Sequence, residues 1–265
     1  MSATPPTTDG AAYLKPTEYE LDEARYDQPA LATDVPRREY VICTTPRCGS
    51  WLLCRQLFNA GLGVPSEYFN LRHIVALASR WNVDPRDTRA YLDALKARRS
   101  TSNGAWGTKL MWTQFAERRS ALKIELMGRA LALYLVRDDV TAQAASLLVS
   151  WTTGLWDIHP IPTTPPRDDL RFDMAELASL ERVMASENAQ WRDLFRSRRI
   201  EPMVISYESL VADQAGTVSR IAQALGYAES EYRVPPAEPR ESATPADVDA
   251  RRRALIERAR LQRRI

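Results

Sequence analysis

The segment that most constrains the fold is YVICTTPRCGSWLL, residues 40–53. An apolar run is followed by a polar turn with Pro, Arg, Gly and Ser, and then by a second apolar run. This order is typical of a buried strand that enters a helix through a tight, anion-binding loop. The nucleotide-hydrolase pattern GxxxxGK[ST] is absent, so the loop alone does not identify the anion.

Three further apolar runs follow this first strand, which we place at 39–45. They predict buried strands at 105–112, 131–137 and 202–207. Helical patterns separate the four runs, and this alternation predicts an α/β fold of three layers around a mostly parallel central sheet. Ligands of such sheets bind at the carboxyl ends of the strands. The predicted helices cover 50–63, 84–99 (capped by Asp84), 138–151, 173–199 and 206–227.

The pattern divides the chain into three parts. We interpret residues 1–38 as a flexible N-terminal arm that docks through Tyr13 or Tyr19, because this stretch lacks sustained periodicity. Residues 39–232 form the predicted globular domain. Residues 233–265 read as a proline-rich linker and a basic C-terminal helix, which is more typical of a solvated or packed helix than of a nucleic-acid or membrane contact.

Composition excludes several classes of protein. The chain has 265 residues and a net charge of only +2, which argues against a nucleic-acid binder. No segment approaches the length of apolar sequence that a membrane span needs. The N-terminus has no basic start followed by an apolar block, so we expect no secretory signal and a cytoplasmic location.

The cysteines indicate neither a disulfide framework nor a metal site. Cys43, Cys48 and Cys54 are odd in number and lie within one predicted strand, turn and helix. No CxxC spacing occurs, so we expect no metal. The spacing also fails the Cys-x5-Arg pattern of phosphatase loops. We therefore expect free thiols, with Cys43 and Cys54 as small core residues.

The loop after the first strand combines several anion-binding groups. Arg47 carries a permanent charge on a planar fork suited to phosphate or sulfate oxygens. Gly49 allows a ligand to approach the backbone closely, and Ser50 adds a hydroxyl donor at a helix start. The alternative is an ordinary turn with a surface arginine.

A second element suggests a second anion. Arg137 ends the third predicted strand, and Ser146 lies on the helix that follows. Together they can hold a second phosphate, although Arg137 can equally pair with Asp138 or Asp139. Two such elements at two strand ends fit a ligand with two separated phosphate-like groups.

These segments resemble a known family. TTPRCGS is similar to the 5′-phosphosulfate loop of sulfotransferases, and VRDDVTAQAAS to their 3′-phosphate motif. The resemblance continues through PSEYFN, GAWGTKLMW, TTGLW and ISYESL, covering roughly residues 39–228 in the family's order. The chain is thereby identified as a member of the bacterial trehalose 2-sulfotransferase-like family of PAPS-dependent sulfotransferases.

The resemblance implies an O-sulfotransferase with a P-loop-like phosphosulfate cradle. Its donor is 3′-phosphoadenosine 5′-phosphosulfate (PAPS), its product is 3′-phosphoadenosine 5′-phosphate (PAP), and it needs no metal. The acceptor is a hydroxyl of a carbohydrate or glycoside-like small molecule or glycolipid, and a homodimer is plausible. Catalytic roles fall to Glu67 and Arg47, and donor contacts to Arg47, Cys48, Gly49, Ser50, Trp51, Arg137, Ser146 and Trp156.

Glu67 matches the family's general base, which takes the proton of the acceptor hydroxyl. Its apolar neighbours Val64, Tyr68 and Phe69 lead us to expect that its pKa rises toward neutrality. From the residues alone, Glu67 reads more readily as a solvent-facing turn residue, and only the motif match favours the catalytic role.

Several residues are candidates for the acceptor site. Lys109, at a predicted strand end, either holds the sulfonate or acceptor or pairs with a carboxylate. His73 is an alternative base or a structural residue. Trp112, Trp151 and Trp156 either face a sugar or pack in the core.

Two other functions stay open on the sequence. A small-molecule kinase-like transferase shares the strand, loop and helix, although the lysine of the nucleotide-hydrolase loop is absent after Gly49. A non-catalytic protein that binds an adenosine phosphate would keep the fold without turnover.

Overall fold

The computed structural model describes residues 23–30, 35, 37–117, 121–154, 156, 173–238 and 246–262. Within them, four strands form one sheet in the order β2-β1-β3-β4, and every neighbouring pair is parallel. The prediction of an α/β fold with a parallel central sheet is therefore confirmed. The strands are β1 (Arg38–Thr44), β2 (Ala105–Met111), β3 (Leu131–Val136) and β4 (Met203–Ser206).

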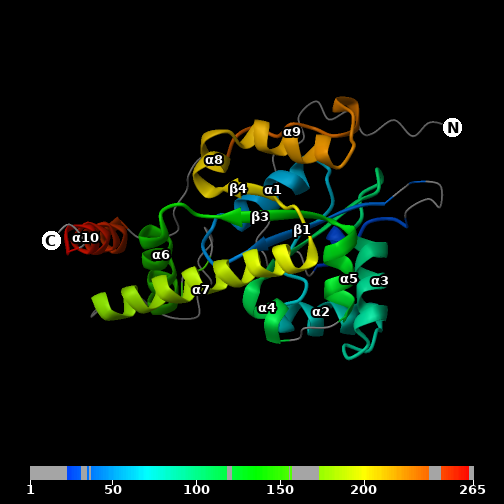
Figure 1. The fold of residues 1–265 in the computed structure, drawn as a ribbon. Helices are drawn as coiled ribbons and strands as arrows, with labels where there is room; N and C mark the ends of the chain where they lie inside the picture. Colours follow the sequence, from blue (N-terminus) through cyan, green and yellow to red (C-terminus); the bar gives the residue numbers. More distant parts are fainter. Residues whose placement is uncertain are drawn as a thin grey trace.

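Helices cover both faces of the sheet (Figure 1). One face carries α1, α8 and α9, and the other carries α2, α3, α4, α5 and α7. The described helices are α1 (Ser50–Asn59), α2 (Leu71–Trp81), α3 (Thr88–Arg99), α4 (Trp112–Glu117), α5 (Ala121–Arg129), α6 (Val140–Thr153), α7 (Met174–Arg198), α8 (Tyr207–Ala212), α9 (Gln214–Ala224) and α10 (Ala246–Gln262), with short 3-10 turns at η2 (Ala24–Tyr26) and η3 (Glu229–Glu231).

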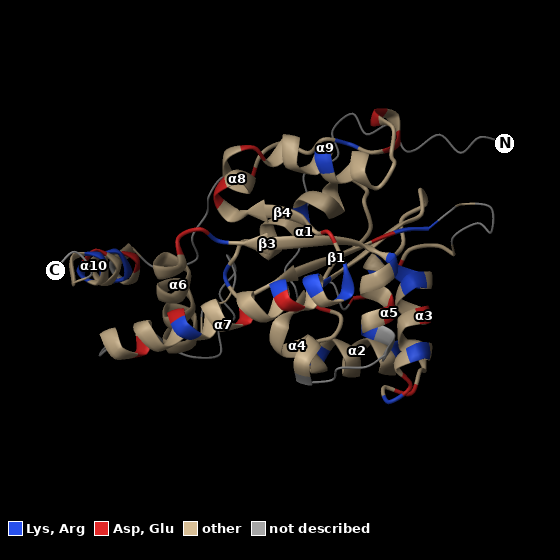
Figure 2. Cartoon of the chain, in the orientation of Figure 1, with Lys and Arg blue, Asp and Glu red and all other residues tan. Residues whose placement is uncertain are grey.

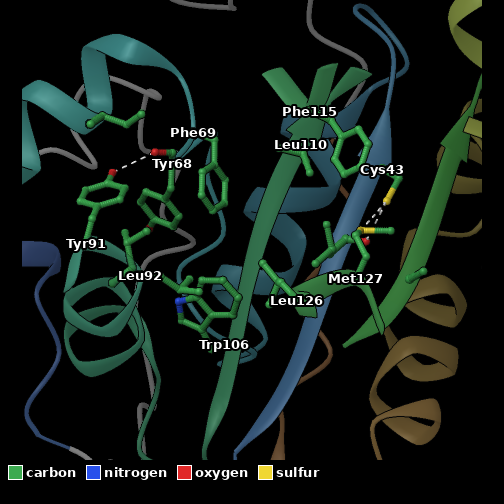
Figure 3. Close-up of a cluster of buried hydrophobic side chains, with 14 of the residues drawn as sticks. Cys43, Tyr68, Phe69, Tyr91, Leu92, Trp106, Leu110, Phe115, Leu126 and Met127 are labelled. Carbon is green, nitrogen blue, oxygen red and sulfur yellow. Dashed lines mark hydrogen bonds between the residues drawn. The ribbon is translucent and has the colours of Figure 1, made fainter. Parts of the chain in front are cut away.

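Alternating side chains of β1 build the two halves of the core. Tyr40 and Ile42 face the layer of α1 and α9, whereas Val41 and Cys43 face the opposite layer. All four are fully buried, as expected for a central parallel strand. Figure 3 shows the second half, where Cys43 lies beside Met127.

The strand order reverses at β1. The chain passes from β1 to β2 on one side, and then returns to β3 on the other side of β1. A crevice at the carboxyl end of the strands forms where the order reverses in this way. The loop after β1 therefore emerges at the position where an open α/β sheet binds its ligand.

The segment predicted as a linker packs against the domain over residues 233–238. Glu238 is buried and forms an ion pair with Arg55 of α1, with an Nη2–Oε1 distance of 2.9 Å. The backbone N–H of Glu238 also donates to Gln214 Oε1 at 2.8 Å. Further on, α10 packs on α6, and its Leu255 and Ile256 belong to one buried cluster with residues of α6 and α7.

Part of the N-terminal arm also contacts the domain. Tyr26 packs edge-on against Phe58 of α1. Asp27 accepts from the Trp81 indole N–H at 3.1 Å and forms an ion pair with the fully buried Arg99 at 3.0 Å. The residues that we expected to dock the arm, Tyr13 and Tyr19, lie outside the described part of the chain.

Several helix boundaries differ from the predictions. α3 begins at Thr88, because Asp87 rather than Asp84 accepts from the backbone N–H of Ala90 and caps the helix. The helix predicted over 206–227 is two helices, since Asp213 ends α8 and caps α9. α2, α4 and α5 were not anticipated; α4 and α5 are short, and short helices give a weak periodic signal.

Candidate functional site

The loop between β1 and α1 has a backbone suited to an anion. Arg47 and Gly49 have positive φ angles of 65° and 77°. Gly49 is the N-cap residue of α1, and within the described chain no side chain caps this helix. The first N–H groups of α1 and the positive end of its dipole therefore stay available to a ligand.

Gln143 of α6 holds this loop in place. Its side-chain Nε2 lies 2.8 Å from Thr45 Oγ1 and 2.7 Å from the Pro46 carbonyl oxygen. It also contacts Cys48 Sγ at 3.1 Å. Cys48 is fully buried, and burial raises the pKa of its thiol. The Cys48 side chain therefore packs inside the loop. Only the backbone of Cys48 can contact a bound ligand.

Arg47 contacts two of the other residues that we expected to bind the donor. Its Nε donates to Ser146 Oγ of α6 at 3.0 Å. Its Nη1 donates to the Trp156 carbonyl oxygen at 2.5 Å. The loop after β1 and the middle of α6 therefore meet through this guanidinium, as expected if they hold one ligand.

Arg137 reaches the same loop from the end of β3. Its Nη1 donates to the Arg47 carbonyl oxygen at 3.2 Å, and its guanidinium stacks 4.5 Å from the centre of the Tyr207 ring. Burial lowers the pKa of Arg137, but a guanidinium stays charged in proteins. Its Nε is buried and has no hydrogen-bond partner in the described chain.

The alternative in which Arg137 pairs with its neighbouring aspartates does not occur among the described residues. Asp139 caps α6 by accepting from the Ala142 N–H, and it also pairs with Arg260 of α10. The backbone N–H groups of Asp138 and Asp139 donate to the Glu208 carboxylate. Arg137 is therefore a partly buried cation whose buried Nε is an unused donor, which suits an anionic ligand.

Glu67 lies in a second polar cluster. Its Oε1 is 2.8 Å from Lys109 Nζ, and its Oε2 accepts from Gln114 Nε2 at 2.8 Å. Burial acts to raise the pKa of Glu67, but the charge of Lys109 and hydrogen bonds from Lys109, Gln114 and Asn70 together hold it below the ordinary value. Our expectation of a pKa raised toward neutrality is therefore wrong, because the apolar neighbours are outweighed by a cation.

Trp51 joins the two clusters. It lies on the first turn of α1, and Lys109 Nζ is 5.4 Å from the centre of its ring. Lys109 is only 3% exposed and pairs with a carboxylate, which was one of its two predicted roles. Trp51 therefore lies between the Glu67–Lys109 pair and the loop after β1.

The remaining residues that we predicted for the acceptor site differ in burial. His73 is buried and its ring lies edge-on to Tyr68, which favours the structural role. Trp112 packs edge-on against Trp191 and stays partly exposed. Trp151 is 58% exposed at the end of α6.

Three residues of the site were missed in the sequence. Gln143 orders the loop, Gln114 donates to Glu67, and Tyr207 stacks on Arg137. Tyr207 lies within ISYESL, so the motif pointed to it without showing its contact. Gln143 likewise lies within VRDDVTAQAAS, without a sign of its contact with the loop. Gln114 carries no sequence signal, because its partner Glu67 is distant in the chain.

The described part of the chain shows neither a metal-binding cluster nor a membrane-spanning helix. It contains no group of three or more His, Cys, Asp or Glu side chains placed to hold a metal ion. None of the helices described there has the length and apolar character needed to cross a bilayer.

The fold and the site define an α/β protein with a loop suited to an anion where the sheet order reverses. Comparison with known proteins makes this class specific. Residues 39–258 match the family described as "Stf0 sulphotransferase", so the chain belongs to that family and is a sulfotransferase. The match extends into α10 and so includes much of the C-terminal segment.

Two curated relatives carry the same name. The chain is 26% identical over 228 residues to the Trehalose 2-sulfotransferase of Mycobacterium tuberculosis, covering 71% of this chain and 84% of that protein. It is 23% identical over 225 residues to the Trehalose 2-sulfotransferase of Mycolicibacterium smegmatis, with the same coverage.

Two of the solved structures that the chain matches are sulfotransferases. The sulfotransferase of Alicyclobacillus acidocaldarius superposes with a TM-score of 0.48 at 16% identity, over 85% of this chain and 93% of that one. The sulfotransferase domain of the Synechococcus PCC 7002 olefin synthase gives 0.43 at 18% identity, over 88% and 98%.

Replacing Gly49 by alanine is predicted to lower the free energy of unfolding of the protein more than the same change at Gly61. Both glycines have φ near +77°, which costs alanine roughly 1–2 kcal/mol. A Cβ at Gly49 would lie 2.5 Å from Tyr207 Cδ2, whereas at Gly61 it meets open space. Overpacking adds about 1–3 kcal/mol. Equal losses of unfolding free energy in urea would contradict this.

Lys109→Met is predicted to reverse the pH dependence of stability that Glu67 contributes. In the wild type, the pKa of Glu67 is lower in the native state than in the unfolded state, where it is about 4.3. Glu67 therefore stabilises the native state at pH values above the unfolded pKa. This stabilisation is lost as the pH falls through the native pKa of Glu67. Without Lys109, burial raises the native pKa, so the free energy of unfolding should increase as the pH falls from about 7 to 5.

Urea unfolding of Lys109→Met beside Lys96→Met tests this sign. Lys96 also pairs with a partly buried carboxylate, that of Glu39, at 2.6 Å. Coincident pH profiles for the two variants would show that Glu67 is not the group controlled by Lys109.

Proposed function

We propose that this sulfotransferase transfers the sulfuryl group of PAPS to a hydroxyl of a carbohydrate or glycoside-like acceptor. The observation behind this proposal is that Arg137 contacts the loop after β1, which itself carries Arg47. Arg47 in turn contacts Ser146 of α6. PAPS has two anionic ends, a 5′-phosphosulfate and a 3′-phosphate, and two arginines at adjoining strand ends suit both. Family membership and the relatives named Trehalose 2-sulfotransferase support the same reaction.

The donor roles follow from the chemistry of each group. The N–H groups of Gly49, Ser50 and Trp51 and the Arg47 guanidinium would bind the 5′-phosphosulfate. Arg137, with its unused buried Nε, and the Ser146 hydroxyl would bind the 3′-phosphate. Trp156, which is 42% exposed, is available to the adenine.

Transfer requires alignment and charge stabilisation more than covalent help. The acceptor oxygen forms a bond to sulfur while the bond from sulfur to the bridging phosphate oxygen breaks. Arg47 would stabilise the negative charge that develops on the leaving phosphate. Glu67 would accept the proton of the acceptor hydroxyl, and its lowered pKa keeps it ionised at neutral pH.

Lys109 gives Glu67 a second property. The buried ammonium of Lys109 stabilises the ionised carboxylate of Glu67. This stabilisation is lost when Glu67 accepts a proton, so protonation of Glu67 is less favourable than it would be without Lys109. Glu67 is therefore a weak base, which suits a hydroxyl whose acidity increases as its oxygen bonds to sulfur.

The acceptor is proposed only as a class. Identities of 23–26% to the named trehalose enzymes support a carbohydrate-like hydroxyl on a small molecule or a glycolipid. Trp151 and Trp156 belong to an irregular segment, residues 151–173, and most of that segment lies outside the described residues. A cytoplasmic location and a homodimer stay predictions from the sequence and the family resemblance.

Calorimetric titration with PAP, beside ATP, tests the donor. We expect PAP to bind and ATP not to bind, because only PAP carries a 3′-phosphate. Arg137→Ala should weaken PAP binding by about tenfold or more, since a charge-assisted contact is lost. Arg129→Ala, an exposed arginine of α5, is the control and should bind PAP normally. A preference for ATP would refute the proposed donor.

Glu67→Gln tests the base. Loss of a general base typically lowers turnover by about 10²–10⁴-fold, and PAP binding should persist because Glu67 lies outside the proposed donor contacts. Turnover is measured as PAP released from PAPS across a panel of sugars. Glu39→Gln is the matched control, because Glu39 is also paired with a lysine but lies near the opposite end of the sheet. Near-normal turnover in Glu67→Gln would assign the base elsewhere.

A further inference from the structure

A surface hollow lies between α4 and α7, at the carboxyl edge of the sheet. Its volume is 390 Å³, within the range of small-ligand sites. Trp112, the residue directly after β2, lines one side, and one face of α7 lines the other. Figure 1 shows α4 beside α7, and Figure 2 shows acidic and basic residues along α7.

Glu187 is the unusual residue of this hollow. It lines the hollow although it is 8% exposed, and its Oε2 has no hydrogen-bond partner among the described residues. Burial raises the pKa of Glu187, as expected for a carboxyl without a compensating cation. An unsatisfied buried carboxyl oxygen is costly. Oε2 is itself covered by the protein, so a rotation of the Glu187 side chain that brought this oxygen to a donor in the hollow would recover a lost interaction.

The hollow adjoins the proposed catalytic centre through two contacts. Trp191, one turn of α7 beyond Glu187, donates its indole N–H to the Thr44 carbonyl oxygen at 3.0 Å, at the end of β1. The rings of Trp191 and Trp112 lie 5.0 Å apart. The helix that lines the hollow, α7, is thus hydrogen-bonded to β1, the strand that precedes the loop proposed to bind PAPS.

The second contact runs through α4. Gln114, two residues after Trp112, donates to the Glu67 carboxylate at 2.8 Å. One short helix therefore carries both a wall of the hollow and a hydrogen-bond partner of the proposed base. A ligand in the hollow would lie on the Glu67 side of the sheet edge.

The chemistry of the lining selects a type of ligand. Glu187 supplies carboxyl oxygens, Ser186 a hydroxyl, Gln190 an amide and Trp112 an aromatic surface. This combination suits a sugar ring, because hydroxyls donate to carboxylates and the C–H face packs on an aromatic ring. Arg182 also lines the hollow and disfavours an ammonium ligand.

We propose that this hollow binds a sugar ring of the acceptor, with hydroxyls donating to Glu187 and the C–H face of the ring on Trp112. The proposal rests on the proposed function, because it assigns the carbohydrate part of the same acceptor. Glu187 then acts as a specificity residue that selects a neutral, hydroxyl-rich acceptor, and it takes no part in the proton transfer.

Saturation-transfer NMR with trehalose and with methyl α-D-glucopyranoside, in the presence of PAP, tests this site. We expect binding of at least one sugar by the wild type. Glu187→Leu should weaken it by about tenfold or more, since a hydrogen bond to a charged group is lost. Glu187→Gln keeps an acceptor oxygen and should weaken it less. Glu176→Gln, an exposed glutamate in the first turn of α7, is the matched control.

Two measurements separate this inference from the proposed function. PAP binding by calorimetry should be the same in Glu187→Leu and the wild type, which also shows that the variant is folded. If PAP binds while neither sugar binds, or if Glu187→Leu binds sugar as the wild type does, the assignment of the hollow is overturned. If the wild type fails to bind PAP, the proposed donor is wrong instead.

Discussion

The loop between β1 and α1 depends on one arrangement of hydrogen bonds around a strained backbone. Arg47 adopts a positive φ angle that a non-glycine residue rarely takes. Gln143 compensates by contacting Thr45 and Pro46, and Arg137 donates to the Arg47 carbonyl oxygen. The residues that brace the loop come from β3 and α6, so the rest of the fold has to be in place before the loop can hold an anion.

Buried ion pairs attach other elements to this centre. The Glu67–Lys109 pair links the segment after α1 to β2, and the Arg55–Glu238 pair links α1 to the segment before α10. Removing one partner of such a pair leaves a charge without compensation, which typically costs about 3–5 kcal/mol. These pairs therefore make the position of each segment depend on the other, whereas exposed pairs contribute little.

The sequence predicted the sheet well and the details of the site less well. The apolar runs of β1 to β4 and the loop after β1 were recognisable. β1 is buried along most of its length, as expected for a central parallel strand. β4, which we predicted to be buried, lies at the edge of the sheet and leaves Val204 64% exposed. The break between α8 and α9 was missed, since Asp213 fits a continuous helical pattern until its capping bond is seen. The lowered pKa of Glu67 was missed because the nearest residues in the chain are apolar, and the cation that controls it comes from β2.

The sequence by itself determined the α/β alternation, the anion loop and the family, because these depend on patterns among neighbouring residues. Only the tertiary structure decided that Lys109 pairs with Glu67, that Arg137 keeps an unused donor, and that Glu187 lines a hollow without a partner. The physical reason is that ionisation and hydrogen bonding depend on burial and on charges from distant parts of the chain. No local pattern in the sequence records those distances.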